Sequence, residues 1–359
     1  MPHPVRLLAG TRKGLFILDG NDGDWTISGP FCEAWPINHA IFDPASGAIH
    51  AAGGNEWFGP AVWTSRDGGK TWSHSSAGLA HPEGEEPVKS AWSLAAGDGV
   101  LYAGVQPAGL FRSTDGGESW TPLDALRMHP SRERWMPGGA GLILHHILVD
   151  PSDARRLWVG ISAAGVFASE DGGESWEPRN RGTRSDFMPE DQRYPEVGQC
   201  VHSLVMAAGG NGRLYQQNHC GMYRSDDRGR SWASIEKGLP STFGFPAAAH
   251  PRCPDTLYLF PLNGDSAGRF APEGRVAVWR TRDAGASWTD LRDGLPQKDA
   301  FLTVLRQGMA ADTHDPVGIY FGTTSGEIYA SRDEGDSWQR IAEHLPLISS
   351  LDVARAGAA

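Results

Sequence analysis

An eight-residue phrase recurs six times along this chain of 359 residues, and it constrains the fold more than any other feature. Its pattern is Ser/Thr-x-Asp-x-Gly-x-Ser/Thr-Trp. The copies begin at Ser65, Ser113, Ser169, Ser225, Thr281 and Ser331. In the first copy, the carboxylate of Asp67 can accept hydrogen bonds from N–H groups of its own turn, and Gly69 can adopt a positive φ. Trp72 then offers a large flat face for packing. The phrase therefore predicts a tight β-hairpin that ends on a packed tryptophan.

The spacing of these tryptophans predicts the number of repeating units. Successive copies place their tryptophans 48 to 56 residues apart, which suits one four-stranded blade of a β-propeller. A degenerate seventh copy ends at Trp25, 47 residues before Trp72. The 25 residues up to Trp25 and the 21 residues after Trp338 together match one more interval. The expected fold is all-β, a seven-bladed β-propeller closed by the C-terminal strand joining the N-terminal blade.

One ring accounts for the whole chain, so residues 1–359 are predicted to form a single domain. In the closing blade, residues 348–353 should form the innermost strand, beside strands over 5–9 and 14–18. Closing the ring in this way covers strand edges that would otherwise be open to other chains. The predicted blades are the closing blade, 4–28 with 346–355, followed by 37–78, 88–124, 142–179, 198–236, 243–294 and 300–343.

The repeated phrase resembles the Asp box of BNR-repeat β-propellers, and the resemblance covers the whole chain. Propellers of this type include sialidases, xyloglucan-acting glycosidases, sortilin-type receptors and photosystem assembly factors. Sialidases share an Arg-Ile-Pro motif near the N-terminus, and this motif does not occur here, so a true sialidase is not expected. Xyloglucan-acting enzymes use two propellers, and assembly factors are seven-bladed and non-enzymatic. The fold alone does not choose among these functions.

Composition excludes several classes of partner. A formal net charge of -11 argues against nucleic acid and anionic membranes as partners. No apolar stretch has transmembrane length, and the N-terminal residues show no apolar signal core, so a cytoplasmic protein is expected. In such a protein, Cys32, Cys200, Cys220 and Cys253 are expected to be free thiols.

Insertions fall on one face of the predicted ring. The Asp-box turns hardly vary in length, whereas the segments 79–90, 124–141 and 179–198 each precede an innermost strand. The segment 262–275 joins a second strand to a third. In this strand order all four segments lie on the face opposite the Asp boxes, which we call the elaborated face. Variable loops on a rigid scaffold usually carry function, so a site is expected at the channel mouth of this face.

Polar and aromatic side chains gather at this mouth when the blades are aligned. His145 and His202 take equivalent positions on neighbouring blades, and Trp92 takes a similar position on the blade before them. His146 aligns with His39 by its distance to the next turn. The predicted ligand-binding residues are Lys13, His39, Glu56, Trp57, Trp92, His146 and Asn218.

Two kinds of chemistry suit the histidines, and the sequence leaves both open. One is a divalent metal site, with His145, His202 and His219 as neutral imidazole ligands and Glu196 or Cys220 as the fourth ligand. Apart from either chemistry, a purely structural interpretation is also open: a histidine on an inner strand donates to a neighbouring carbonyl and closes the channel.

The other kind of chemistry is acid–base catalysis, with His145, His202, Tyr194 and Glu196 as the catalytic residues. The predicted function is a propeller that binds a carbohydrate-like or small polar ligand at a histidine-rich channel mouth. If it is an enzyme, hydrolase chemistry of the glycosidase type or lyase chemistry is expected. The alternative is a non-catalytic scaffold that binds a protein partner through the elaborated face.

Overall fold

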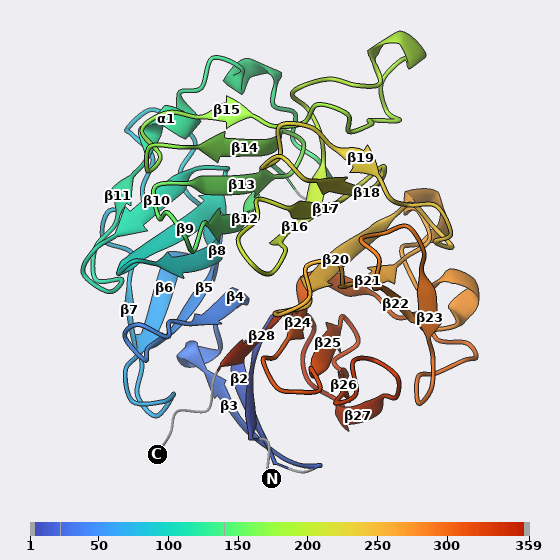
Figure 1. The fold of residues 1–359 in the computed structure, drawn as a ribbon. Coiled ribbons are helices and arrows are strands. Elements are labelled where there is room, and N and C mark those ends of the chain that lie inside the picture. The colour runs from blue at the N-terminus through green and yellow to red at the C-terminus, as the bar shows by residue number, and fades with distance from the viewer. Residues whose placement is uncertain (1–3, 22, 140, 355–359) are drawn as a thin grey trace.

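The structure is a computed structural model that describes residues 4–21, 23–139 and 141–354 of the chain. In this part of the chain nearly all regular structure is β-strand, and the sheets are arranged around a common axis (Figure 1). Five sheets have four strands each, and a sixth sheet has eight. The eight-stranded sheet is two units of four, joined where Gln307 and Ser350 form the single bridge between β24 and β28. The described strands thus form seven four-stranded blades, and the predicted fold class is confirmed.

Within each blade the strands are named here in order from the axis outward. The closing blade contains β28 (Ile348–Ala354), β1 (Val5–Thr11), β2 (Gly14–Asn21) and β3 (Asp24–Phe31). The next three blades contain β4 (Ile37–Phe42), β5 (Ile49–Asn55), β6 (Gly59–Ser65) and β7 (Ser73–Ser75); β8 (Ser90–Gly97), β9 (Val100–Gln106), β10 (Leu110–Ser113) and β11 (Thr121–Pro122); and β12 (Leu144–Val149), β13 (Leu157–Ile161), β14 (Gly165–Ser169) and β15 (Glu177–Pro178). The last three contain β16 (Val201–Met206), β17 (Leu214–Asn218), β18 (Gly221–Ser225) and β19 (Ala233–Ser234); β20 (Gly244–Ala249), β21 (Leu257–Pro261), β22 (Val278–Thr281) and β23 (Thr289–Leu291); and β24 (Val304–Ala311), β25 (Ile319–Thr323), β26 (Ile328–Ser331) and β27 (Gln339–Ala342).

Helical structure is confined to short turns. The helices are α1 (Asp124–Arg127) and the 3-10 turns η1 (Cys32–Ala34), η2 (Arg132–Arg134), η3 (Glu190–Gln192), η4 (Asp265–Ala267) and η5 (Pro272–Gly274). All but η1 lie in the inserted segments of the elaborated face. Within the described ranges no helix is long and apolar enough to cross a membrane.

The C-terminal strand closes the ring as expected. β28 pairs antiparallel with β1, from Arg6 opposite Ala354 to Thr11 opposite Ile348. Figure 1 shows the two ends of the chain on the same side of the molecule. Residues 1–3, 22, 140 and 355–359 of the predicted domain, including the last residue of the predicted closing blade, lie outside the described residues.

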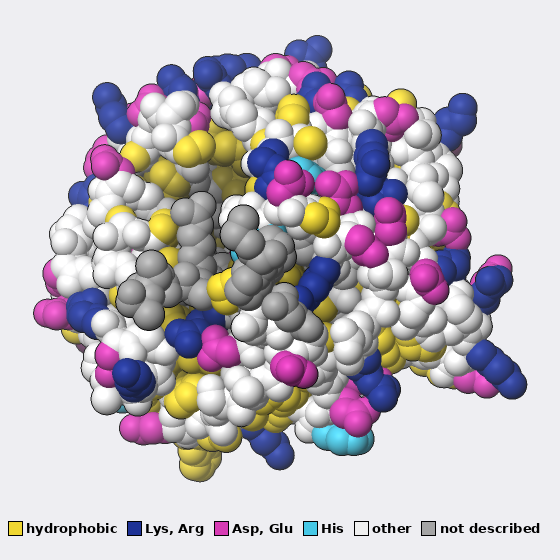
Figure 2. All heavy atoms as spheres, turned by 60° about the horizontal axis from the view of Figure 1, so that its bottom comes forward, with side chains coloured by type: hydrophobic (Ala, Val, Ile, Leu, Met, Phe, Trp, Pro, Cys, Tyr) yellow, Lys and Arg dark blue, Asp and Glu magenta, His cyan; other side chains and the backbone are white. Residues whose placement is uncertain are grey.

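Apolar packing lies between neighbouring blades rather than at the axis. Trp158 and Val166 of one blade, for example, form one buried cluster with Val201 and Leu204 of the next. Central strands such as β13 are buried along their whole length, because blades cover both of their faces. On the side that bears the chain ends, acidic and basic side chains are interspersed (Figure 2).

The Asp boxes form the turns that the sequence predicts. In the first box, Asp67 Oδ1 accepts hydrogen bonds from the backbone N–H groups of Lys70 (3.0 Å) and Thr71 (2.9 Å). The Ser65 hydroxyl donates to the same carboxylate (2.8 Å) and accepts from the N–H of Gly69 (2.8 Å). The fourth position of every box has a positive φ, even where it is Arg228, Ala284 or Glu334. The fifth position is glycine in every box and also has a positive φ, so the turn depends on the Asp, the hydroxyl and this glycine together.

Every innermost strand carries a β-bulge at the same level of the ring. One extra residue is inserted between the paired positions of four strands in succession: Asn38, Trp92, His145 and His202. The strands β20 and β28 are bulged there too. In β24 the irregular stretch is longer, because Val304 pairs with Thr323 and the next pair is Met309 with Phe321. Bulges re-aim side chains, and here they do so around the axis.

Candidate functional site

The bulged residues join neighbouring blades. Asn38 Nδ2 donates to the carbonyl oxygen of Ala91 in the next blade (2.9 Å). His202 Nδ1 lies 2.7 Å from the carbonyl oxygen of Gly244, also in the next blade. A carbonyl can only accept, so Nδ1 of His202 carries the hydrogen and Nε2 has the free lone pair. This is the structural role that the sequence left open, and for His202 it leaves one ring nitrogen available.

Histidines line a cavity of about 150 Å³ on the axis. His39 Nδ1 accepts the N–H of Leu94 (3.1 Å), and burial lowers the pKa of His39 to about 4. Burial, with a smaller contribution from His39 and Arg306, lowers the pKa of His146 to about 3. His145 Nδ1 lies 2.9 Å from His146 Nδ1, and its pKa is held well below the usual value by burial and by nearby cations. These rings are therefore neutral at pH 7.

The same cavity contains an acid that the sequence analysis missed. Asp352, on β28, lines it together with His39 and His146. Burial raises the pKa of Asp352 to about 6, although the N–H of Val353 donates to its carboxylate (2.9 Å). No motif marks this residue, although the sequence places residues 348–353 on the innermost strand of the closing blade.

The long irregular stretch of β24 plugs the axis. The side-chain amide of Gln307 donates to the carbonyl oxygen of His145 on a distant blade. The Arg306 guanidinium lies 4.9 Å from the ring centre of Phe245, and its Nε has no hydrogen-bond partner among the described residues. Arg306 and Gln307 line both the 150 Å³ cavity and a smaller one of about 40 Å³. The plug thus divides the axis into two compartments.

The smaller cavity faces the elaborated side of the ring. It is lined by Arg12, Asn38, Trp92, Leu305, Arg306, Gln307 and Ser349. Arg12 lies in the turn between β1 and β2, and Trp92 occupies its bulge at the start of β8. The described lining includes two arginines and no carboxylate. The mouth expected from the sequence is therefore cationic as well as aromatic.

A second group of ligand-type side chains lies on the hairpin of β16 and β17. The donor atoms of Cys200, His202 and His219 all lie within 4.8 Å of one another. Cys200 Sγ is 3.7 Å from His202 Nε2. The N–H of His219 donates to the carbonyl oxygen of Cys200 (2.9 Å), which holds these residues opposite each other.

This group differs from the predicted metal ligands. Cys200 replaces His145 in it, so the structure does not bring together the expected triad of His145, His202 and His219. Neither predicted fourth ligand belongs to the group. The Cys-x-His spacing at the start of β16 was the signal that could have identified Cys200.

The predicted fourth ligands and acid–base partners serve their own loops. Glu196 accepts a hydrogen bond from the N–H of Asn180 (3.1 Å), and Cys220 Sγ accepts one from the N–H of Asp186 (3.3 Å). Tyr194 is exposed on the segment 179–198, with 67% of its surface accessible. The catalytic roles of Tyr194 and Glu196 stay predictions. All four cysteines are free, as expected.

The remaining predicted ligand contacts are spread over the elaborated face. Lys13 and Trp57 are exposed on turns between second and third strands, and Glu56 pairs with Lys89 (2.9 Å). Asn218 is buried, and its oxygen accepts the N–H of Cys220 (3.3 Å). Asn218 therefore shapes the hairpin that carries His219.

Large apolar side chains are also exposed on this face. Nine such residues are exposed in the described chain, and all except Ile27 lie in its loops. They are Trp57, Phe58, Met128, Met136, Phe187, Met188, Tyr194 and Phe301. Eight of the nine exposed large apolar residues therefore lie on the elaborated face.

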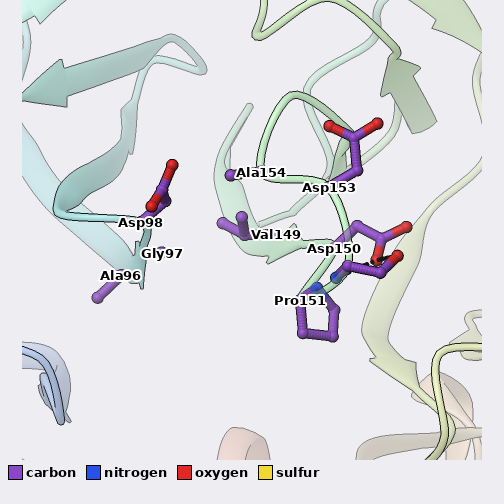
Figure 3. Close-up of a pocket in the computed structure, with 9 residues that line it drawn as sticks. Ala96, Gly97, Asp98, Val149, Asp150, Pro151, Asp153 and Ala154 are labelled. Carbon is purple, nitrogen blue, oxygen red and sulfur yellow. Dashed lines mark hydrogen bonds between the residues drawn. The ribbon is translucent and has the colours of Figure 1, made fainter.

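A larger cavity lies on the opposite face and carries no comparable chemistry. It measures about 490 Å³ and lies between the turn at Asp98 and the turn that follows β12 (Figure 3). The carboxylate of Asp150 in the second turn accepts hydrogen bonds from Ser152 and Arg156. These contacts fix the turn, which lies on the same face as the Asp boxes, as expected from the strand order.

Comparison with known proteins supports the repeat and the fold. The family model described as BNR/Asp-box repeat matches residues 111–122. A xyloglucanase of a Paenibacillus species is 26% identical over 252 residues, covering 65% of this chain and 23% of the relative. A xyloglucanase of Acetivibrio thermocellus is 24% identical over 255 residues, covering 65% of this chain and 29% of the relative. The chain thus spans about a quarter of the length of these curated relatives.

Solved structures share the fold at low sequence identity. The GH74 xyloglucanase of Xanthomonas campestris has a TM-score of 0.63 at 19% identity, over 94% of this chain and 52% of the other. The periplasmic gluconolactonase of Pseudomonas aeruginosa has a TM-score of 0.62 at 14% identity, over 98% and 99%. YCF48 bound to D1 peptide has a TM-score of 0.54 at 15% identity, over 86% and 81%. Proteins with sugar-directed names and a peptide-binding protein therefore share this architecture.

Proposed function

Because this chain is a β-propeller built from BNR/Asp-box repeats, we propose that it binds a small carbohydrate-like ligand bearing a negative charge. The observation that carries this proposal is the cationic cavity at the elaborated end of the axis, with Arg306 at its base and Trp92 in its wall. The cavity of about 40 Å³ has room for a carboxylate or a similar group, and the rest of the ligand lies among the surrounding loops.

The electrostatics of Arg306 favour an anion. Its pKa is lowered because the guanidinium is buried, and its Nε lacks a hydrogen-bond partner among the described residues. A buried charge is costly unless a partner of opposite charge compensates it. A planar guanidinium can hold a carboxylate or phosphate oxygen through charge-assisted hydrogen bonds. Arg12, at the rim, adds a second positive charge.

The carbohydrate part of the proposal rests on the aromatic wall and on the relatives. A tryptophan face suits the apolar face of a sugar ring, and Trp92 lines the cavity beside the cation. Relatives named as xyloglucanases match 65% of this chain. A cytoplasmic location, expected from the sequence, remains part of the proposal. Hydrolase or lyase chemistry stays a prediction.

The test compares two sugars that differ at one carbon, where glucuronate carries a carboxylate and glucose carries a neutral hydroxymethyl group. Glucuronate should bind the wild-type chain, whereas glucose should bind much more weakly, as measured by calorimetric titration. Arg306→Gln should weaken glucuronate binding about tenfold or more, since a hydrogen bond to a charged group contributes about 1.5–3 kcal/mol. Arg66→Gln is the matched control, because Arg66 is exposed on the opposite face. Equal affinity of the wild-type chain for both sugars would contradict the proposal.

A protein partner is the second candidate, and the exposed apolar side chains favour it. Methionine and aromatic residues are typical of surfaces that bind other proteins. Met128, Met136, Phe187, Met188 and Phe301 are exposed on the same face. A peptide or protein that binds here should lose affinity in Phe187→Ser and keep it in Ile27→Ser, whose apolar side chain is exposed on the outer strand β3. Unchanged affinity in Phe187→Ser would exclude this face.

A further inference from the structure

We propose that Cys200, His202 and His219 bind a zinc-class metal ion at the elaborated end of the axis. Their donor atoms lie within 4.8 Å of one another. Two imidazoles and one thiolate suit Zn²⁺, which takes nitrogen and sulfur ligands in tetrahedral geometry. This inference is independent of the sugar-binding proposal.

The hairpin of β16 and β17 preorganises the three ligands. Cys200 directly precedes β16, and His202 is the second residue of that strand. Val201 pairs with Asn218, which places Cys200 opposite His219. The bulge at His202 then turns its ring toward the other two, and the ring centres of His202 and His219 lie 5.0 Å apart.

A second hydrogen bond fixes the ring of His202 for metal binding. Its Nδ1 donates to the carbonyl oxygen of Gly244 (2.7 Å), which leaves Nε2 unprotonated and aimed at Cys200. Metal-bound histidines almost always donate their other N–H in this way. Burial of His202, with only 1% of its surface accessible, prevents competing contacts with water.

Aromatic rings enclose the group. Phe187, Phe243 and Phe245 pack against the two imidazoles, with ring centres 4.6 to 5.2 Å from them. Such an apolar shell limits access of solvent and strengthens electrostatic contacts inside it. Tetrahedral zinc ligands lie about 3.3–3.8 Å apart, given metal–ligand bonds of roughly 2.0–2.3 Å. Binding must therefore draw the three side chains inward, around a His202 that is buried and a His219 and Cys200 that are partly buried.

Charge predicts the character of the fourth ligand. Binding releases the proton of the Cys200 thiol, so the ion and the thiolate together carry one positive charge. Arg306 interacts electrostatically with both His202 and Cys200, and Arg269 interacts electrostatically with His202. These cations disfavour a bare metal ion. The fourth position should hold an anion, such as hydroxide or a carboxylate, that compensates the excess positive charge.

The experiment loads the purified chain with zinc alone and measures metal content, thermal stability and thiol reactivity. The wild-type chain should retain about one zinc ion per chain after dialysis, since the three ligands form one site. Zinc should raise the melting temperature, because an ion that binds only the folded state stabilises it. It should also protect Cys200 from alkylation, because a metal-bound thiolate is shielded.

Matched variants separate the site from other thiols. Cys200→Ser and His219→Asn should each weaken zinc binding about tenfold or more. Cys253→Ser should bind zinc as the wild type does, because Cys253 is an exposed cysteine on the opposite face. Both ligand variants should keep the zinc-free melting temperature, which shows that they fold. Zinc content unchanged in folded Cys200→Ser, or equal alkylation of Cys200 with and without zinc, would overturn the proposal and leave only a thiol–imidazole hydrogen bond.

Discussion

Individual side chains at the two faces of this propeller do different work. In the Asp boxes, each carboxylate is saturated by hydrogen bonds from its own turn, as in the contacts of Asp171 with Ser169 and Ser175. On the elaborated side, Arg306 and His202 keep polar atoms that the turn or the backbone does not use. A saturated group holds the fold, whereas a polar atom left available can meet a ligand.

Replacing one Asp-box carboxylate should affect stability and not binding. Asp171→Ala removes acceptors for the Ser175 N–H (2.9 Å) and hydroxyl (2.6 Å), so the free energy of unfolding should fall by about 1–3 kcal/mol. Hydrogen bonds hold the pKa of Asp171 at about 2, so this contribution is present above about pH 4 and is lost as pH falls toward 2. Urea denaturation measures both effects.

Glu174→Ala serves as the control, because Glu174 lies in the same box and its side chain is 71% exposed. Its effect should be within about 0.5 kcal/mol. Loss of glucuronate binding in Asp171→Ala at unchanged stability would mean that the ligand binds on the Asp-box face.

At the scale of elements, the innermost strands set the chemistry of the axis through their bulges. The bulges aim Asn38, Trp92, His145 and His202 at the axis or at the next blade. The longer irregular stretch of β24 adds the plug that separates the two axial cavities. The result is a row of neutral histidines beside a single acid, Asp352.

These histidines should make the protein less stable in mild acid. The pKa of His39 is about 4 and that of His146 about 3, below the value of about 6.5 in an unfolded chain. As pH falls from about 6.5 to about 4, these histidines therefore bind protons in the unfolded chain but not in the folded chain. Each such histidine lowers the free energy of unfolding by up to about 1.4 kcal/mol per pH unit in this window.

Asp352 opposes this effect. Its folded pKa of about 6 lies above its usual value, so it favours the folded state as pH falls through the same range. The histidines outnumber it, and the melting temperature should fall between about pH 7 and pH 4.5. His39→Gln, which can still accept the N–H of Leu94, should show a smaller fall. An identical pH profile for His39→Gln and wild type would show that His39 titrates normally in the fold.

On the scale of the whole molecule, stability depends on closing the ring. The last strand, β28, pairs with β1 over six residue pairs, and Ile348 and Leu351 are buried in the cluster that joins the first and last blades. No single blade has an apolar core of its own, since the buried clusters lie between blades. A ring without its closing strand therefore exposes apolar surface on two blades at once.

Removing the closing strand should lower the stability of the fold severely. A chain that ends at Leu347 should lose on the order of 5 kcal/mol or more, which approaches the whole stability of a domain. Leu351→Ala is the milder test, and a loss of about 2–5 kcal/mol is expected from the cavity that it leaves. Ile27→Ala, in the exposed outer strand of the same blade, should change stability by less than about 0.5 kcal/mol. Equal melting temperatures for Leu351→Ala and Ile27→Ala would contradict this role for β28.

The architecture could be predicted from the sequence alone. The Asp box is a local structure, because Asp67, Ser65 and Thr71 bond within one turn, and such contacts can be recognised from spacing. Regular recurrence of that turn then predicted the number of blades, and the two incomplete ends predicted the closure. The elaborated face also followed, since insertion lengths can be counted without a structure.

Which side chains lie together on the axis could not be predicted from the sequence. His145 was expected beside His202 and His219, but the bulges and the strand pairing of β16 with β17 put Cys200 there instead. Arg306 reaches the axis through an irregular stretch with no sequence signature, and Asp352 through a strand from the far end of the chain. The axial cavities are lined by residues more than a hundred positions apart, and a bulge of one residue redirects a side chain. Local sequence specifies neither.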